Sequence, residues 1–120
     1  MPKKSRVQEW LEGYVWQKKR IDALRAEEKN AAEPLKAQYR DWITAMEAQQ
    51  AETLEAIRSI ECEKVQEAIR LRYITGIPVR KICYEISHAR SVVFELLKQG
   101  RAVLEAKGYP HVRGKAQDER

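Results

Sequence analysis

Residues 64–104 read KVQEAIRLRYITGIPVRKICYEISHARSVVFELLKQGRAVL, and their apolar residues recur at helical spacing with two interruptions. The interruptions are Gly76-Ile77-Pro78 and Ile86-Ser87-His88. Glycine can adopt the left-handed conformation that ends a helix, while proline lacks an amide proton and suits only the first turn of a helix. The sequence therefore predicts three short helices in this stretch, separated by two tight turns.

The second and third of these expected helices have the layout of a helix-turn-helix. The second runs from Pro78 to about Glu85, and the third from near Ala89 to about Lys107. Their inward-facing positions are apolar, with small residues where the helices would cross: Ile82, Cys83, Ile86, Ser87, Val93 and Leu96. In such a motif the last helix enters the major groove of DNA.

The side chains on the outside of this motif predict how it would contact DNA. Those expected near base edges are Arg90, Ser91, Phe94 and Glu95, and those expected on phosphates are Arg80, Lys81, His88, Lys98 and Arg101. Phosphate contacts position a protein on the duplex, whereas base contacts give it specificity. Phe94 has two alternatives, because its ring could contact a thymine methyl group or fill the crevice between the helices.

Three segments carry a resemblance to a known family: AIRLRYITG at 68–76, VRKI at 79–82 and RSVVF at 90–94. They resemble the helix-turn-helix of sigma-factor region 4, and in particular phage and prophage regulators of the ArpU type, which carry a charged helical hairpin before such a domain. The chain departs from the pattern at Pro78, at Ala89 and at Gly100, which is expected to interrupt the last helix. The resemblance implies a transcription regulator that binds double-stranded DNA, and it adds contact with RNA polymerase as a further hypothesis.

The charge distribution favours a polyanionic partner. The net charge is +5, and residues 78–115 contain eight basic and three acidic residues. A basic excess on a helix-turn-helix pattern is typical of nucleic-acid binding. The alternative is an ordinary solvated basic face.

The first half of the chain, residues 5–60, predicts two long helices. The first carries an apolar stripe of Val7, Trp10, Tyr14, Ile21 and Leu24, and the second a stripe of Leu35, Tyr39, Trp42, Met46, Thr53, Ala56 and Ile60. Trp16 and Ile43 lie off these stripes. The pattern weakens at residues 29–34, which favours an antiparallel hairpin over one helix kinked at Pro34.

Two helices alone bury little apolar surface, so the hairpin predicts a further packing partner. We expect a homodimer whose contact residues are Trp10, Tyr14, Ile21, Leu24, Tyr39 and Trp42. The alternative is a monomer whose hairpin packs on its own C-terminal helices. Two other functions stay open: a phage DNA-packaging subunit of the small-terminase kind, and an adaptor on RNA polymerase.

The sequence offers little support for an enzyme, a metal site or a cofactor. Cys62, Cys83, His88 and His111 do not have metal-ligand spacing, and no Gly-x-Ser-x-Gly or glycine-rich phosphate loop occurs. No apolar run is long enough for a membrane span, and both cysteines fall in expected helices, so we expect a cytoplasmic protein. The predicted fold is all-α: a hairpin at 1–60, a helix-turn-helix domain at 61–108 and a basic, disordered tail at 109–120.

Overall fold

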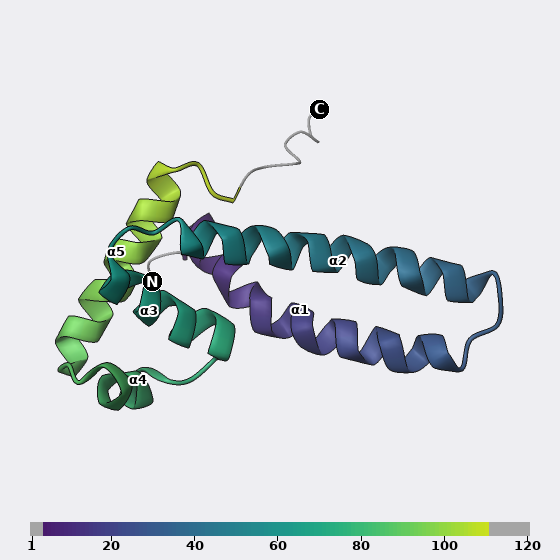
Figure 1. Cartoon of the computed structure of the whole chain (residues 1–120), viewed down its shortest axis with the longest axis horizontal. Helices are drawn as coiled ribbons and strands as arrows, with labels where there is room; N and C mark the ends of the chain where they lie inside the picture. Colours follow the sequence, from purple (N-terminus) through teal and green to yellow (C-terminus); the bar gives the residue numbers. More distant parts are fainter. Residues whose placement is uncertain (1–3, 111–120) are drawn as a thin grey trace.

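The computed structural model describes residues 4–110, and within that range the chain is all-helical, with no strand (Figure 1). Its elements are α1 (Arg6–Lys29), α2 (Leu35–Arg58), α3 (Glu63–Ile69), a π-helical segment η1 (Arg70–Thr75), α4 (Val79–Ile86) and α5 (Arg90–Ala106). The predicted all-α class is confirmed. The basic residues of the expected tail, His111, Arg113, Lys115 and Arg120, lie outside the described residues.

Helices α1 and α2 form the expected antiparallel hairpin, which extends from the rest of the molecule as an arm (Figure 1). Ser5 begins α1, because its side-chain oxygen accepts a hydrogen bond from the Gln8 amide at 3.1 Å. Pro34 directly precedes α2, so the chain turns there and does not continue as one kinked helix. Neither helix combines length with an apolar composition that would span a membrane, and the same holds for the other helices of residues 4–110.

The apolar stripe predicted for α1 is largely confirmed. The stripe predicted for α2 is wrong in the N-terminal half of that helix, which lies far from the C-terminal helices. Ile43, which lies off that stripe, is buried at 5% exposure against Ile21 and Leu24. Leu35 and Trp42, which lie on the stripe, are 45% and 46% exposed. Apolar residues occupy more than one side of α2, and the position of α1 decides which side becomes buried.

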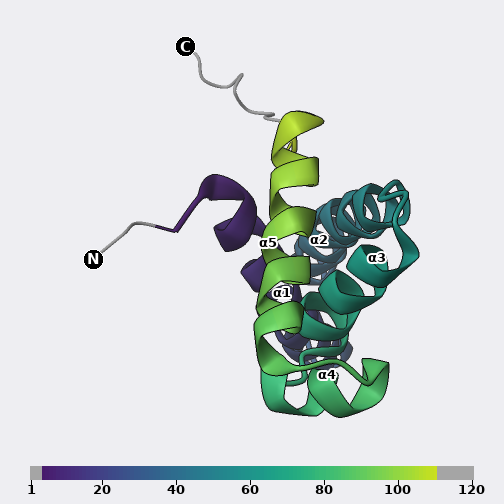
Figure 2. The ribbon, with the colours of Figure 1, turned by 90° about the vertical axis from the view of Figure 1, so that its left-hand side faces the viewer.

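The C-terminal helices and the near end of the hairpin share one hydrophobic core. Val7 and Leu11 of α1 are buried together with Ile82, Val93 and Leu104. Figure 2, which looks along the hairpin, shows α5 running across its end with α3 and α4 beside it. The core is thus continuous across the expected domain boundary at residue 60, and the hairpin does pack on its own C-terminal helices.

Gly100 allows α3 and α5 to cross closely. A β-carbon built at Gly100 would lie 2.4 Å from Cγ1 of Ile69, which no real structure tolerates. Gly100 lies within α5 and is buried, so the expectation that it interrupts the last helix is wrong. Position 100 requires glycine because glycine has no side chain, and the conformational freedom of glycine is not needed there.

Two further expectations need correction. Cys62 is exposed and precedes α3 as its N-cap residue, so it does not lie inside a helix. Tyr109 stacks on Trp10, with ring centroids 5.5 Å apart and planes 7° from parallel. Tyr109 was expected in the tail, but it packs against the folded part of the chain.

Candidate nucleic-acid interface

Two left-handed residues set the orientation of α4. Gly76 ends η1 with φ 82°, and its amide donates to the Leu71 carbonyl at 3.0 Å. Ser87 ends α4 with φ 57°, and the next amide, of His88, donates to the Cys83 carbonyl at 3.1 Å. The two predicted turns therefore occur where the sequence placed them, with α4 beginning at Val79, one residue after Pro78.

Ile82 and Val93 hold α4 and α5 together, since both are fully buried in the shared core. Because these residues face inward, the opposite side of α5 faces solvent. Ser91, Glu95 and Lys98 are exposed on that side. The inner and outer faces predicted for α5 are thus present.

Phe94 belongs to the solvent face of α5. It is 48% exposed and lines the crevice between α4 and α5, so its ring borders that crevice without being fully buried in it. The Arg90 guanidinium carbon lies 5.7 Å from the centre of the Phe94 ring. That distance is within the range of a cation–π contact.

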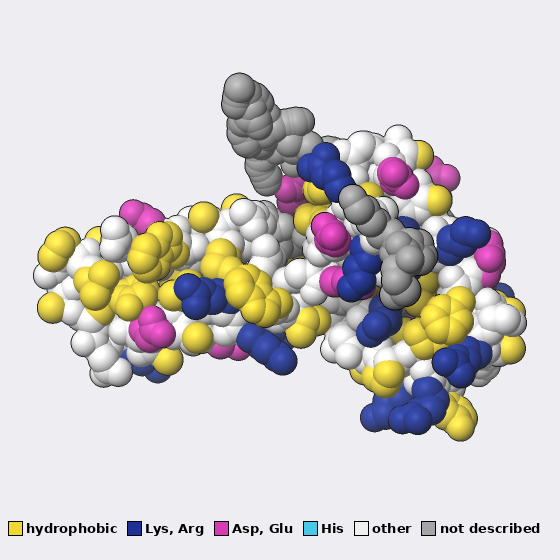
Figure 3. Space-filling model, turned by 180° about the vertical axis from the view of Figure 1, so that it is seen from behind, with side chains coloured by type: hydrophobic (Ala, Val, Ile, Leu, Met, Phe, Trp, Pro, Cys, Tyr) yellow, Lys and Arg dark blue, Asp and Glu magenta, His cyan; other side chains and the backbone are white. Residues whose placement is uncertain are grey.

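An open hollow lies between the beginning of α4 and the beginning of α5. Its lining includes the arginines Arg72, Arg80 and Arg90 together with His88, and no Asp or Glu among the described residues lines it. Pro78 and Val79 line it from the start of α4, Ala89 lines it just before α5, and Phe94 lines it from the second turn of α5. Figure 3 shows Lys and Arg side chains gathered with apolar ones at the α4 end of the molecule.

The two helix beginnings make this hollow more favourable for anions. Neither Pro78 nor Ala89 makes a side-chain capping hydrogen bond, and neither α4 nor α5 has an acidic residue in its first turn. The first amides of a helix lack intrahelical acceptors and carry the positive end of its dipole. Three arginines, a histidine and two helix N-termini therefore surround the same space, which suits a phosphate group.

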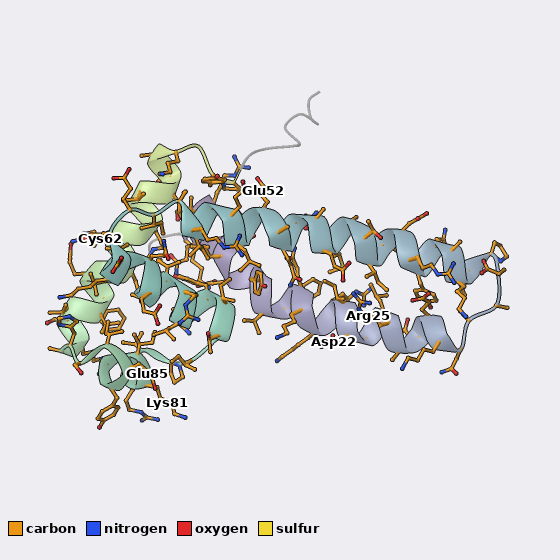
Figure 4. The ribbon with its side chains drawn as sticks, in the orientation of Figure 1. Asp22, Arg25, Glu52, Cys62, Lys81 and Glu85 are labelled. Atoms are coloured by element: carbon orange, nitrogen blue, oxygen red, sulfur yellow. The ribbon has the colours of Figure 1, made fainter. Side chains whose placement is uncertain are left out.

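The structure brings only some of the predicted phosphate-contacting residues together. Arg80 and His88 line the hollow, whereas Lys81 lies at the outer edge of α4 on the same helix as Glu85 (Figure 4). Lys98 is exposed further along α5. Arg101 is half-buried and donates from Nη1 to the Tyr73 hydroxyl at 3.2 Å, so part of its guanidinium is already occupied.

Arg72 and Tyr84 were missed in the sequence analysis. Arg72 lines the hollow from η1, and Tyr84 lines it from α4 with an exposure of 82%. The π-helical geometry of η1 changes the direction of its side chains relative to an α-helix, and α-helical periodicity does not predict it. The available signal for Tyr84 was an aromatic residue placed beside the inward-facing Cys83.

The predicted oligomerisation residues have different environments. Tyr14, Ile21 and Leu24 are buried in the chain's own cores, and Trp10 and Tyr39 are half-buried. Trp42 is exposed, as are two other large apolar residues of the arm, Trp16 at 63% and Leu35. Figure 3 shows apolar side chains along the arm on the face that it presents.

Comparison of the chain with protein-family models, with curated proteins and with solved structures gives no match. Within residues 4–110, no group of three or more His, Cys, Asp or Glu side chains is arranged to hold a metal ion. The assignment of a function therefore rests on the geometry of the hollow, on the solvent face of α5 and on the arm.

Proposed function

We propose that the chain is a transcription regulator of the phage type that binds duplex DNA, with α4 and α5 acting as a helix-turn-helix. The observation that carries this proposal is the acid-free hollow lined by Arg72, Arg80, His88 and Arg90. It lies at the start of α5, where a helix-turn-helix approaches the DNA backbone as its last helix enters the major groove.

In this arrangement, Arg72, Arg80 and His88 hold backbone phosphates in and around the hollow. The solvent face of α5 then lies along the base edges, with Ser91 and Glu95 in the groove and Lys98 near the next phosphates. Arg90 is exposed at the first position of α5, where its guanidinium can contact either a phosphate or a guanine. RNA polymerase is a second proposed partner, supported by the resemblance to sigma-factor region 4.

The exposed apolar residues of the arm support the proposed homodimer. Trp16, Leu35 and Trp42 are large side chains that the single chain leaves in solvent. Pairing two chains would cover them and would double the phosphate contacts on DNA. Analytical ultracentrifugation tests this step. A dimer supports the regulator, and a ring of eight or more chains favours the packaging subunit. A monomer at tens of micromolar, a range typical of weak association, contradicts the proposed homodimer.

The binding experiment is a fluorescence-anisotropy titration of a labelled duplex at several salt concentrations. If about four to six phosphates are neutralised per chain, the slope of log affinity against log salt is about −4 to −5 per chain. The double variant Arg72→Gln and Arg80→Gln, which removes two proposed phosphate contacts, is expected to bring that slope about two closer to zero. A slope near zero for the unmodified chain would contradict DNA binding.

The matched control is the double variant Lys18→Gln and Lys19→Gln. Both lysines are exposed on α1. This variant changes the net charge by the same amount, so it separates a site at the hollow from a general charge effect. Equal losses for the two variants would show that the hollow is not the interface.

A further inference from the structure

Phe94 occupies a position where an apolar ring contributes little to the fold. It is 48% exposed and lies outside both buried clusters. Tyr84 at 82% and Val92 at 39% are the other exposed large apolar residues of α4 and α5. Exposed apolar residues beside a cationic hollow mark a contact surface more often than a structural feature.

Arg90 is the polar partner of Phe94 on this surface. It precedes Phe94 by one helical turn, and its guanidinium carbon lies 5.7 Å from the ring centre. Among residues 4–110 it makes no ion pair. The ring therefore restricts the guanidinium without using its hydrogen-bond donors, which leaves them available for a ligand.

We infer that Arg90 and Phe94 together recognise a guanine with a thymine at the neighbouring base pair. Arg90 donates to O6 and N7 of the guanine, and the Phe94 ring contacts the 5-methyl group of the thymine. That methyl group is the apolar feature of the major groove. Neighbouring base pairs are about 3.4 Å apart along the duplex, so side chains 5.7 Å apart can contact adjacent steps.

This inference rests on the proposed DNA binding and adds the chemistry of the preferred sequence. The experiment begins with selection of bound duplexes from a random library by the full-length protein. Each thymine of the selected site is then replaced by deoxyuridine, which lacks only the methyl group. Since burying one methyl-sized group contributes about 0.8 kcal/mol, affinity is expected to fall about fourfold at one position per bound chain.

The variants assign that loss to Phe94. In Phe94→Ala the same deoxyuridine replacement is expected to change affinity by less than about 1.5-fold, since no ring is left to contact the methyl group. Tyr84→Ala is the matched control, because Tyr84 is an exposed aromatic residue of the same hollow, and it is expected to retain the fourfold loss. Circular dichroism melting confirms that both variants fold.

The outcomes separate this inference from the function on which it rests. Equal affinity for thymine and deoxyuridine at every position would overturn the inference, and so would a loss that persists in Phe94→Ala. If Phe94→Ala binds the selected duplex as tightly as the unmodified chain, the ring serves a different partner and the inference is wrong. The absence of any duplex binding would instead overturn the proposed function.

Discussion

The arm and the C-terminal end of the molecule differ in how many helices cover each buried residue. At the far end of the arm, Ile21 and Leu24 of α1 meet Ile43 of α2, and no third helix within residues 4–110 belongs to this cluster. At the other end, residues from all the helices enter one core, in which Ile82 and Val93 are completely buried. Similar apolar side chains therefore contribute differently to stability according to the number of neighbours that surround them.

An isoleucine-to-alanine substitution is expected to destabilise the chain more in the C-terminal core than in the arm. Ile82→Ala leaves a cavity enclosed on all sides and is expected to cost about 4 kcal/mol of unfolding free energy, whereas Ile43→Ala should cost about 2 kcal/mol because the thin arm can close around the gap. Urea unfolding measures both values. Equal costs would show that the arm is packed as firmly as the C-terminal core.

The same glycine-to-alanine substitution is expected to destabilise the chain at Gly100 and to stabilise it at Gly13. Gly100→Ala places a β-carbon 2.4 Å from Ile69, and overpacking of this kind costs about 1–3 kcal/mol. A β-carbon added at Gly13, in α1, would meet nothing within 4 Å. Gly13→Ala is therefore expected to stabilise the chain by about 0.5–1 kcal/mol. Thermal melting distinguishes the two, and a stabilising Gly100→Ala would contradict the close crossing of α3 and α5.

The turns of the two regions provide a smaller contrast. Ser87 has φ 57°, a conformation that glycine adopts without strain, whereas Asn30, at the turn of the arm, has φ −102°. Ser87→Gly is expected to stabilise the chain by about 0.5 kcal/mol, since relief of strain exceeds the added freedom of the unfolded chain. Asn30→Gly has no strain to relieve and should be neutral or slightly destabilising. Chemical unfolding of both variants is the measurement, and equal shifts would argue against strain at Ser87.

The smallest expected effect is a pH dependence at the start of α1. Lys4 donates a hydrogen bond to Glu12 at 2.8 Å, and this bond lowers the pKa of the Glu12 carboxyl below its ordinary value of 4.5. A lowered pKa means that the contribution to stability is present above pH 4.5 and is lost as pH falls through the folded-state value. Glu12→Gln should remove this part of the acid sensitivity, which is small because the pair is exposed to solvent. Melting temperatures between pH 2 and pH 7, roughly the range over which carboxyl groups titrate, test it, and an unchanged profile would contradict the assignment.

Local chemistry explains which parts of the fold were predictable. Gly76 and Ser87 each end a helix through a left-handed conformation and hydrogen bonds to carbonyls only a few residues away. The two turns and the helices beside them could therefore be predicted from the sequence. The buried side of α2 depends on the position of α1, which is why Ile43 and Trp42 exchanged their expected environments. Gly100 is explained only once α3 is placed against α5.

The same distinction applies to the candidate interface. Arg80, His88 and Arg90 were predicted because the helix-turn-helix pattern places their side chains on its outside. Arg72 was not, because it reaches the hollow from a π-helical segment that precedes both helices. The sequence left two alternatives for Phe94, and the packing of α5 leaves its ring half-exposed at the edge of the hollow.

The stack of Tyr109 on Trp10 has a mechanical consequence. It joins a residue near the beginning of the described chain to one near its end, and Val7, Leu11 and Leu104 occupy the same core beside it. Tension applied between the two ends is therefore carried through the contact of α1 with α5, while the far part of the hairpin lies outside the loaded path. A force that pulls on the tip of the arm would instead act along the axes of α1 and α2, and it would be resisted where these helices enter the shared core. A partner bound to the side of the arm would therefore apply its force where α1 and α2 enter the shared core.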